Sequence, residues 1–229
     1  MKSTKTITGY TKMPLSGKKP QGLLVLLHGY GGNGHHLFRA LSSLREQFPD
    51  FAIALPDGPV ELNVNVHAWI RLSFPIEEEQ LWNGAVETAP LLEDYITKEL
   101  QTLGLKENQL ILLGFSQGSI MSLHVGLRLK ADPMAIIALS GFLVGAEKLG
   151  SITSRPPVYL INGDIDTVVM PDEVIKTKQA LETHGVEVHH KVIQRVGHVI
   201  DQTVLETIVA VINQLTEGKS LEEKESRTH

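Results

Sequence analysis

The sequence predicts an α/β protein whose mostly parallel, doubly wound sheet is flanked by helices. Short, continuously apolar segments bounded by Gly or Pro alternate with longer segments that carry apolar residues at helical spacing. This alternation indicates right-handed crossovers between parallel strands. The length of 229 residues suits one domain with a sizeable core, and no internal repeat or linker divides it. We therefore expect a single domain over residues 1–215, followed by a polar, flexible tail over 216–229.

The expected strands share short apolar runs that end at Gly, Pro or a polar residue. They occupy residues 23–28, 51–55, 109–114, 134–139, 158–162 and 186–193, and 7–13 is a candidate for a further edge strand. The expected helices occupy residues 36–47, 90–103, 119–130, 171–184 and 203–215. Pro90 fits the first turn of its helix behind Thr88 as an N-cap, and it would kink a helix that began earlier.

The segment 56–83 departs from this rhythm, because it is a long connection with scattered apolar residues. Connections of this length are usually functional or disordered. Its two tryptophans, Trp69 and Trp82, argue against disorder. Whether the segment acts as a lid stays open.

Composition excludes several classes of protein. The net charge of −5 and the absence of a basic patch give no sign of nucleic-acid binding. No apolar run approaches the roughly 20 residues that span a bilayer, and the charged, polar start does not resemble a secretory signal. The absence of cysteine excludes disulfides, thiol nucleophiles and thiolate metal sites. We expect a cytoplasmic protein without a membrane span.

A Gly-x-Ser-x-Gly sequence at residues 114–118 is the most informative motif of the chain. It directly follows an expected strand and directly precedes an expected helix. This context indicates a nucleophile elbow, a tight turn that holds Ser116 strained and exposed at the carboxyl edge of the sheet. The two glycines are needed because side chains there would collide with the neighbouring strand and helix.

An acid and a histidine follow at the ends of two later strands. Asp164 and Asp166 leave the strand at 158–162, and His198 follows the strand at 186–193. Catalytic groups of open α/β sheets gather at the carboxyl ends of strands. His198 is the candidate base that activates the Ser116 hydroxyl, and Asp166 is the candidate carboxylate that orients His198. We assign Asp164 a backbone-capping role.

The oxyanion formed during acyl transfer needs two backbone N–H donors. One is expected at Gln117, the residue after the nucleophile. The other is expected at Tyr30, within the Gly-rich segment 28–33 that leaves the first strong strand. No Gly-Lys-Ser/Thr sequence follows this segment, which excludes a Walker-type phosphate loop. His28 is expected to be a hydrogen-bonded structural residue.

Together these residues resemble the carboxylesterase/phospholipase family of α/β hydrolases, which includes the acyl-protein thioesterases. The matching segments lie in family order at residues 26–31, 55–59, 68–69, 114–118, 163–169 and 197–198. The resemblance implies an α/β-hydrolase fold with no large cap domain. It also supports Asp166 over Asp164 as the acid.

The resemblance further implies hydrolysis of small-molecule or lipid-like acyl esters or thioesters, with short to medium acyl chains. Lysophospholipids and acylated proteins are possible substrates, and transient contact with a membrane surface is possible. It suggests that Trp69, Leu72 and Val168 line the acyl site. Departures at Asn162, where members often carry His, and at Ser119, where a third Gly is common, leave the substrate subclass open.

Three readings of function remain. The first is a serine carboxylesterase, as a monomer or homodimer, that needs no cofactor and no metal. The second is a non-catalytic ligand-binding or scaffold domain, against which the complete Ser, acid and His set argues. The third is a lactonase similar to dienelactone hydrolases, which would use a cysteine nucleophile that this chain lacks. The ten histidines show no metal-binding spacing.

Overall fold

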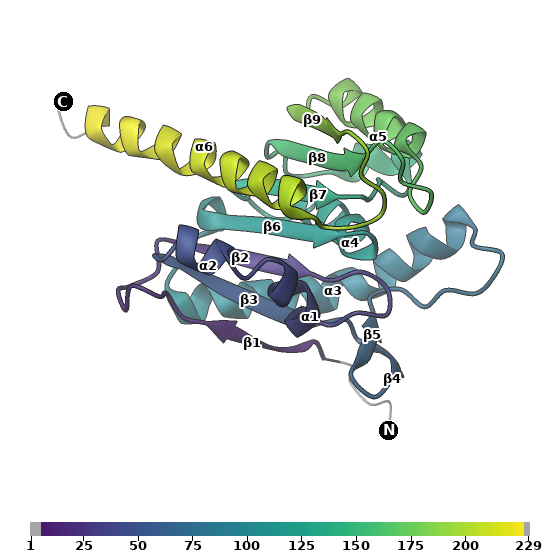
Figure 1. Cartoon of the computed structure of the whole chain (residues 1–229), viewed down its shortest axis with the longest axis horizontal. Helices are drawn as coiled ribbons and strands as arrows, with labels where there is room; N and C mark the ends of the chain where they lie inside the picture. The colour runs from purple at the N-terminus through teal and green to yellow at the C-terminus, as the bar shows by residue number, and fades with distance from the viewer. Residues whose placement is uncertain (1–5, 227–229) are drawn as a thin grey trace.

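The structure is a computed structural model that describes residues 6–226, with side chains as far as residue 217. Within that range a seven-stranded sheet forms the centre of the molecule, in the order β1-β3-β2-β6-β7-β8-β9 (Figure 1). Its strands are β1 (Thr8–Lys12), β2 (Gly22–Leu27), β3 (Phe51–Asp57), β6 (Leu110–Phe115), β7 (Ala135–Leu139), β8 (Val158–Gly163) and β9 (Val188–Ile193). Neighbouring strands are parallel except β1, which pairs antiparallel with β3. The prediction of a mostly parallel sheet with an added N-terminal edge strand is confirmed.

Helices cover both faces of this sheet. They are α1 (Gly34–Ala40), α2 (Leu44–Gln47), α3 (Glu78–Leu103), α4 (Gln117–Gly126), α5 (Pro171–Thr183) and α6 (Gln202–Ser226). The first two and α6 pack on one face, and the other three pack on the opposite face (Figure 1). Every residue of β2 is buried, with Leu24 and Leu26 facing α1 and α6, and the alternate Leu23 and Val25 facing α3 and α4. Burial on both faces explains why this strand reads as a continuous apolar run.

The helix expected to begin near Pro90 begins instead at Glu78. Pro90 lies inside α3, and the Thr88 hydroxyl donates a hydrogen bond to the Trp69 carbonyl instead of capping the helix. Leu81, Ala85 and other apolar side chains of the added turns are buried in the core at helical spacing. Their burial outweighs the roughly 3 kcal/mol that an internal proline costs a helix.

Other helix boundaries also differ from the prediction, and α4 ends at Gly126 instead of at residue 130. The expected helix over 36–47 is two short helices, α1 and α2, and both place leucines on the same face of the sheet. The last helix was expected to end at Leu215, but α6 continues to Ser226 through the polar residues assigned to the tail. Residues after 215 contain no proline, so nothing in the sequence forces the helix to end there. Flexibility over 216–226 stays a prediction, and residues 227–229 lie outside the described range.

The long connection between β3 and α3 contains a small hairpin. Strands β4 (Val60–Asn63) and β5 (Val66–Ala68) pair antiparallel and project from the edge of the main sheet (Figure 1). His67 on β5 forms an isolated bridge with Gly32, in the loop that follows β2. The connection is therefore structured and attached to the carboxyl edge of the sheet. Across residues 6–226, no helix is long and apolar enough to span a bilayer.

A buried histidine lies in the core next to α3. His124 on α4 is 3 % exposed, and its ring meets the Trp82 ring edge-on at 5.1 Å. Its Nδ1 has no hydrogen-bond partner among the described residues. Burial, helped by the nearby Arg128 guanidinium, lowers the pKa of His124 to about 4. The neutral imidazole is therefore the form that the fold accommodates.

We expect His124→Phe to reduce the acid sensitivity of the fold. Because the folded pKa lies below the ordinary 6.5, the unfolded chain binds the proton more tightly, and stability is lost as pH falls from 6.5 to about 4. For this one group the loss approaches about 3 kcal/mol. Phe keeps the ring contact with Trp82 and removes the unpaired nitrogen. Urea unfolding at several pH values measures the effect, and parallel curves for the variant and the wild type between pH 7 and 4 would contradict it.

Candidate active site

Ser116 lies at the turn between β6 and α4 in a backbone conformation that side chains rarely adopt. Its φ is 54° and its ψ is −117°. A Cβ on Gly114 would lie 2.3 Å from the Gly118 carbonyl oxygen, and a Cβ on Gly118 would lie 1.9 Å from the Leu27 carbonyl oxygen. Both distances are far below ordinary contact, so only glycine fits at these positions. The predicted tight turn with its two required glycines is confirmed.

The turn brings Ser116 to His198, which lies 82 residues further along the chain. His198 Nε2 is 3.0 Å from Ser116 Oγ, and His198 Nδ1 is 2.8 Å from Asp166 Oδ2. The loops after β8 and β9 carry the acid and the histidine, while the serine follows β6. The Phe115 ring lies against the imidazole, with ring centroids 4.9 Å apart. The three side chains therefore form one hydrogen-bonded line at the carboxyl edge of the sheet.

Asp166 is 2 % exposed and fully hydrogen-bonded. Burial alone would raise its pKa, but the Val169 N–H, the His198 ring and the Val168 N–H together outweigh burial and lower the pKa below its ordinary value. The carboxylate is thus held ionised beside the imidazole. Asp164 accepts a hydrogen bond from the Arg195 N–H, which is the backbone role predicted for it. Among the two aspartates, only Asp166 bonds to His198.

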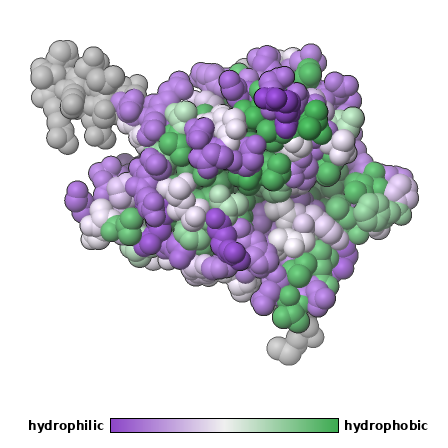
Figure 2. Space-filling model, in the orientation of Figure 1, coloured by the Kyte–Doolittle hydropathy of each residue, from purple (hydrophilic) through white to green (hydrophobic). Residues whose placement is uncertain are grey.

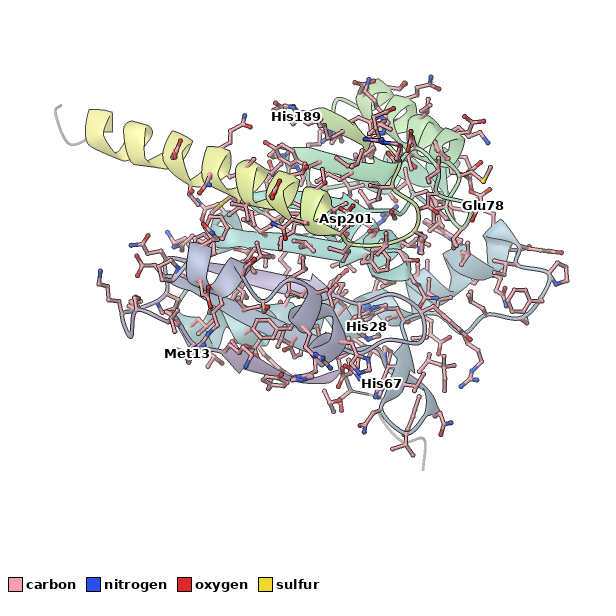
Figure 3. The ribbon with its side chains drawn as sticks, viewed as in Figure 1. Met13, His28, His67, Glu78, His189 and Asp201 are labelled. Atoms are coloured by element: carbon pink, nitrogen blue, oxygen red, sulfur yellow. The ribbon has the colours of Figure 1, made fainter. Side chains whose placement is uncertain are left out.

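The loop after β2 approaches the serine closely. A Cβ on Gly29 would lie 3.4 Å from the Ser116 Cβ. The His28 ring supports this loop, because Nδ1 donates to the Gly29 carbonyl at 2.8 Å while Nε2 accepts from the Gly58 N–H at 2.9 Å. Burial lowers the pKa of His28 to about 4, so the ring stays neutral. The predicted structural role of His28 is confirmed. Figure 3 shows His28 close to His67 of the hairpin.

The loop also carries Tyr30, the expected second oxyanion donor. Neighbouring backbone groups attach it to the hairpin, since Gly31 N–H donates to the His67 carbonyl and His67 N–H donates to the Gly32 carbonyl, both at 2.9 Å. Within residues 6–226, the N–H groups of Tyr30 and Gln117 donate to no other protein atom. Both remain free for a ligand oxygen, and their role as an oxyanion hole stays a prediction.

The Gln117 side chain has a role that the sequence did not indicate. Its Oε1 accepts the N–H groups of Trp69 and Ile70 at 2.8 and 3.1 Å, and its Nε2 donates to the Ile70 carbonyl at 2.8 Å. The side chain is 4 % exposed, so these bonds are shielded from water. The residue after the serine therefore ties the long connection to the elbow. Only its hydrogen-bond partners, which lie 47 and 48 residues away, identify this role, and a single sequence does not reveal them.

The three predicted acyl-site residues occupy different environments. Trp69 is 0 % exposed, and its Nε1 donates to the His28 carbonyl at 2.8 Å. The buried ring therefore supports the loop after β2, and its predicted contact with substrate stays a prediction. Leu72 is partly buried against the core cluster of α3 and α4, and Val168 is 67 % exposed beside Asp166. Their substrate contacts stay predictions.

A cavity of about 370 Å³ opens beside the imidazole. Its walls come from the loop after β2, from α1, and from the residues around Phe115 and His198. A second cavity of about 390 Å³ is lined by residues such as Trp82 and Lys148. None of Ser116, His198 and Asp166 lines this second cavity. In the described part of the chain, no group of three His, Asp or Glu side chains is placed to hold a metal ion.

The sheet, the strained serine and its hydrogen-bonded His and Asp define the α/β-hydrolase class of enzymes. Comparison with known proteins then identifies the family. A model of the phospholipase/carboxylesterase family matches residues 10–216, and the chain belongs to that family. It is a serine hydrolase that acts on carboxylic esters or thioesters.

Relatives and solved structures agree with this assignment. An acyl-protein thioesterase 1 from Neurospora crassa is 25 % identical over 213 residues, which is 85 % of each chain. An esterase called PE8 is 34 % identical, with a TM-score of 0.87 over 92 % of this chain and 99 % of that one. The structure of an acyl-protein thioesterase 2 from Zea mays, 21 % identical with a TM-score of 0.67 over 91 % of this chain and 98 % of that one, shows the same fold.

We expect Gln117→Leu to destabilise the protein and to lower esterase activity. The substitution leaves two buried N–H groups and one carbonyl without a partner, at a cost of about 3 kcal/mol. Freed residues 69–70 should also loosen the support of the loop that carries Tyr30, lowering kcat by about tenfold. Urea unfolding and ester hydrolysis measure the two effects. The exposed Gln202→Leu is the matched control and should change stability by less than about 0.5 kcal/mol; equal effects of the two variants would contradict the prediction.

Proposed function

We propose that Ser116, His198 and Asp166 hydrolyse acyl esters or thioesters through an acyl-enzyme. The observation that carries the proposal is the continuous pair of hydrogen bonds, 3.0 Å from serine to imidazole and 2.8 Å from imidazole to carboxylate. Those distances lie within the reach that proton transfer requires. The family's carboxylesterases and the names of the thioesterase relatives support both ester and thioester substrates.

In the proposed reaction His198 Nε2 removes the Ser116 proton as the oxygen attacks the acyl carbon. The ionised Asp166 stabilises the imidazolium that forms. The N–H groups of Tyr30 and Gln117 bind the oxyanion of the tetrahedral intermediate. His198 then gives its proton to the departing oxygen or sulfur, and a water molecule activated by the same imidazole releases the acid. The substrates we propose are small-molecule or lipid-like acyl esters.

Replacing the serine tests the nucleophile. We expect Ser116→Ala to lower kcat on p-nitrophenyl butanoate by at least about 10³-fold while the fold is kept, because it removes the hydroxyl that bonds to His198. A fluorophosphonate probe should add its mass to Ser116 in the wild type and to no residue in the variant. Ser119 is an internal control, since its buried hydroxyl donates to backbone carbonyls. Retained activity in the variant, or labelling at another residue, would sink the proposal. A wild type that neither hydrolyses the ester nor takes up the probe would favour the scaffold domain.

The acid has its own test. Asp166→Asn keeps an oxygen for the N–H groups of Val168 and Val169 but removes the charge beside His198. We expect kcat/KM at pH 7 to fall by about 10³- to 10⁴-fold, because the imidazole loses both its orientation and the stabilisation of its charged form. Asp164→Asn should reduce kcat/KM by less than about tenfold, because within residues 6–226 that carboxylate bonds only to backbone. The reverse order of effects would reassign the acid to Asp164.

A further inference from the structure

The cavity beside His198 is built from three separate parts of the chain. The loop after β2 supplies residues 28–33, and α1 supplies His36, Leu37 and Ala40. Phe115 and the residues 198–200 complete the wall. Gly29 in this wall lies next to the Ser116 Cβ, so the cavity adjoins the attacking oxygen. Its volume of about 370 Å³ falls within the range of small-molecule sites.

The position of the imidazole decides which half of a substrate lies in this cavity. When the tetrahedral intermediate collapses, the bond from the acyl carbon to the departing oxygen or sulfur breaks, and that atom keeps the electron pair. It receives the proton from His198 Nε2, so it must lie within hydrogen-bond reach of that nitrogen. His198 forms part of the cavity wall together with Val199 and Ile200. The cavity therefore lies where the leaving group has to pass.

The wall is apolar and carries no fixed charge. Five of its side chains are aliphatic or aromatic hydrocarbon, namely Leu37, Ala40, Phe115, Val199 and Ile200. None of its residues is Lys, Arg, Asp or Glu. In Figure 2 apolar residues gather across the middle of this face, where α6 crosses the sheet. A charged group placed here would lose hydration without gaining a partner of opposite charge.

The polar side chains of the wall are largely engaged within the protein. Asn33 Nδ2 donates to the Asn65 carbonyl at 2.9 Å, and its Oδ1 accepts the His36 N–H at 2.8 Å. Both ring nitrogens of His28 are bonded to backbone groups. His36, which also lines the cavity, is an exposed residue. The interior of the cavity thus selects shape and apolarity over hydrogen bonding.

We propose that this cavity is the leaving-group subsite and that it accepts uncharged, apolar alcohols and thiols. The inference rests on the proposed hydrolysis at Ser116 and names the half of the substrate that determines selectivity. It predicts poor use of esters whose alcohol carries a permanent charge, as lysophospholipids do. Acyl chains then lie outside this cavity, away from the His198 loop.

Two esters with the same acyl group and the same shape test whether the cavity disfavours a charged alcohol. Acetylcholine and 3,3-dimethylbutyl acetate differ only in a quaternary nitrogen that replaces a carbon. We expect the wild type to prefer the neutral ester by at least about tenfold in kcat/KM, since about 1.4 kcal/mol of lost hydration suffices for that ratio. Equal kcat/KM values for the two esters would overturn the inference that the cavity selects uncharged alcohols.

Variants of Ala40 test whether the cavity is the cause. Ala40 is exposed at the end of α1, so substitutions there should leave the core intact. Ala40→Asp should shift the preference toward acetylcholine by about threefold or more, because it places a carboxylate on the wall. The matched control is Val86→Asp, which adds the same charge on an exposed position of α3. A shift of the same size in the control would contradict the inference.

Ala40→Trp should fill the cavity. Its effect on different esters then distinguishes a cavity that binds the alcohol from one that binds the acyl chain. We expect kcat/KM on 3,3-dimethylbutyl butanoate to fall by at least about tenfold relative to methyl butanoate. The ratio of methyl hexanoate to methyl acetate should stay within about twofold of the wild-type ratio. The opposite pattern, in which acyl-length preference moves and alcohol preference does not, would assign the cavity to the acyl chain. A wild type that hydrolyses none of these esters would instead contradict the proposed function.

Discussion

The close backbone contact at the elbow is the constraint on which the rest of the site depends. Gly118 lies so near the Leu27 carbonyl that no side chain fits, and this contact fixes the start of α4 against the end of β2. Ser116 keeps its φ of 54° because β6 and β7 hold the turn on both sides, through the bond from Ser116 N–H to the Leu139 carbonyl. Strain of this kind costs about 1–3 kcal/mol and persists only where surrounding structure determines it. The buried parallel sheet supplies that structure.

Two side chains extend this constraint from the elbow to the surrounding loops. Gln117 leaves the elbow and bonds three backbone groups of residues 69–70. Trp69 in turn donates to the His28 carbonyl, and His28 bonds the backbone of Gly29 and Gly58. The serine turn, the long connection and the Gly-rich loop are therefore joined by one set of buried hydrogen bonds. A backbone donor in that loop can hold a fixed position relative to Ser116, as electrostatic stabilisation of an oxyanion requires.

Much of this arrangement follows from local patterns, and the rest depends on contacts between distant segments. The buried strands β2 and β6 are continuous apolar runs, and Ser116, Asp166 and His198 each follow a strand, so topology alone places them on one edge. The start of α3 was wrong because Pro90 is a strong local signal, while the deciding burial of Leu81 is tertiary. The bond from Trp69 to the His28 carbonyl is tertiary in the same way, since an apolar residue in a long loop looks the same in sequence whether it lines a site or supports one.

Hydrogen-bond partners explain why only one of two strand-end histidines suits proton transfer. His28 accepts a backbone N–H at Nε2 and donates to a carbonyl at Nδ1, so a second ring proton would face the Gly58 N–H and break that bond. His198 has a carboxylate at Nδ1 and a hydroxyl at Nε2. A hydroxyl can both give and accept a proton, and the carboxylate stabilises the charged ring. The partners of each ring therefore give His28 a supporting role and favour the proposed catalytic role of His198. His198 also borders the apolar cavity, so in the proposed reaction the ring that delivers the proton would also bound the space available to the leaving group.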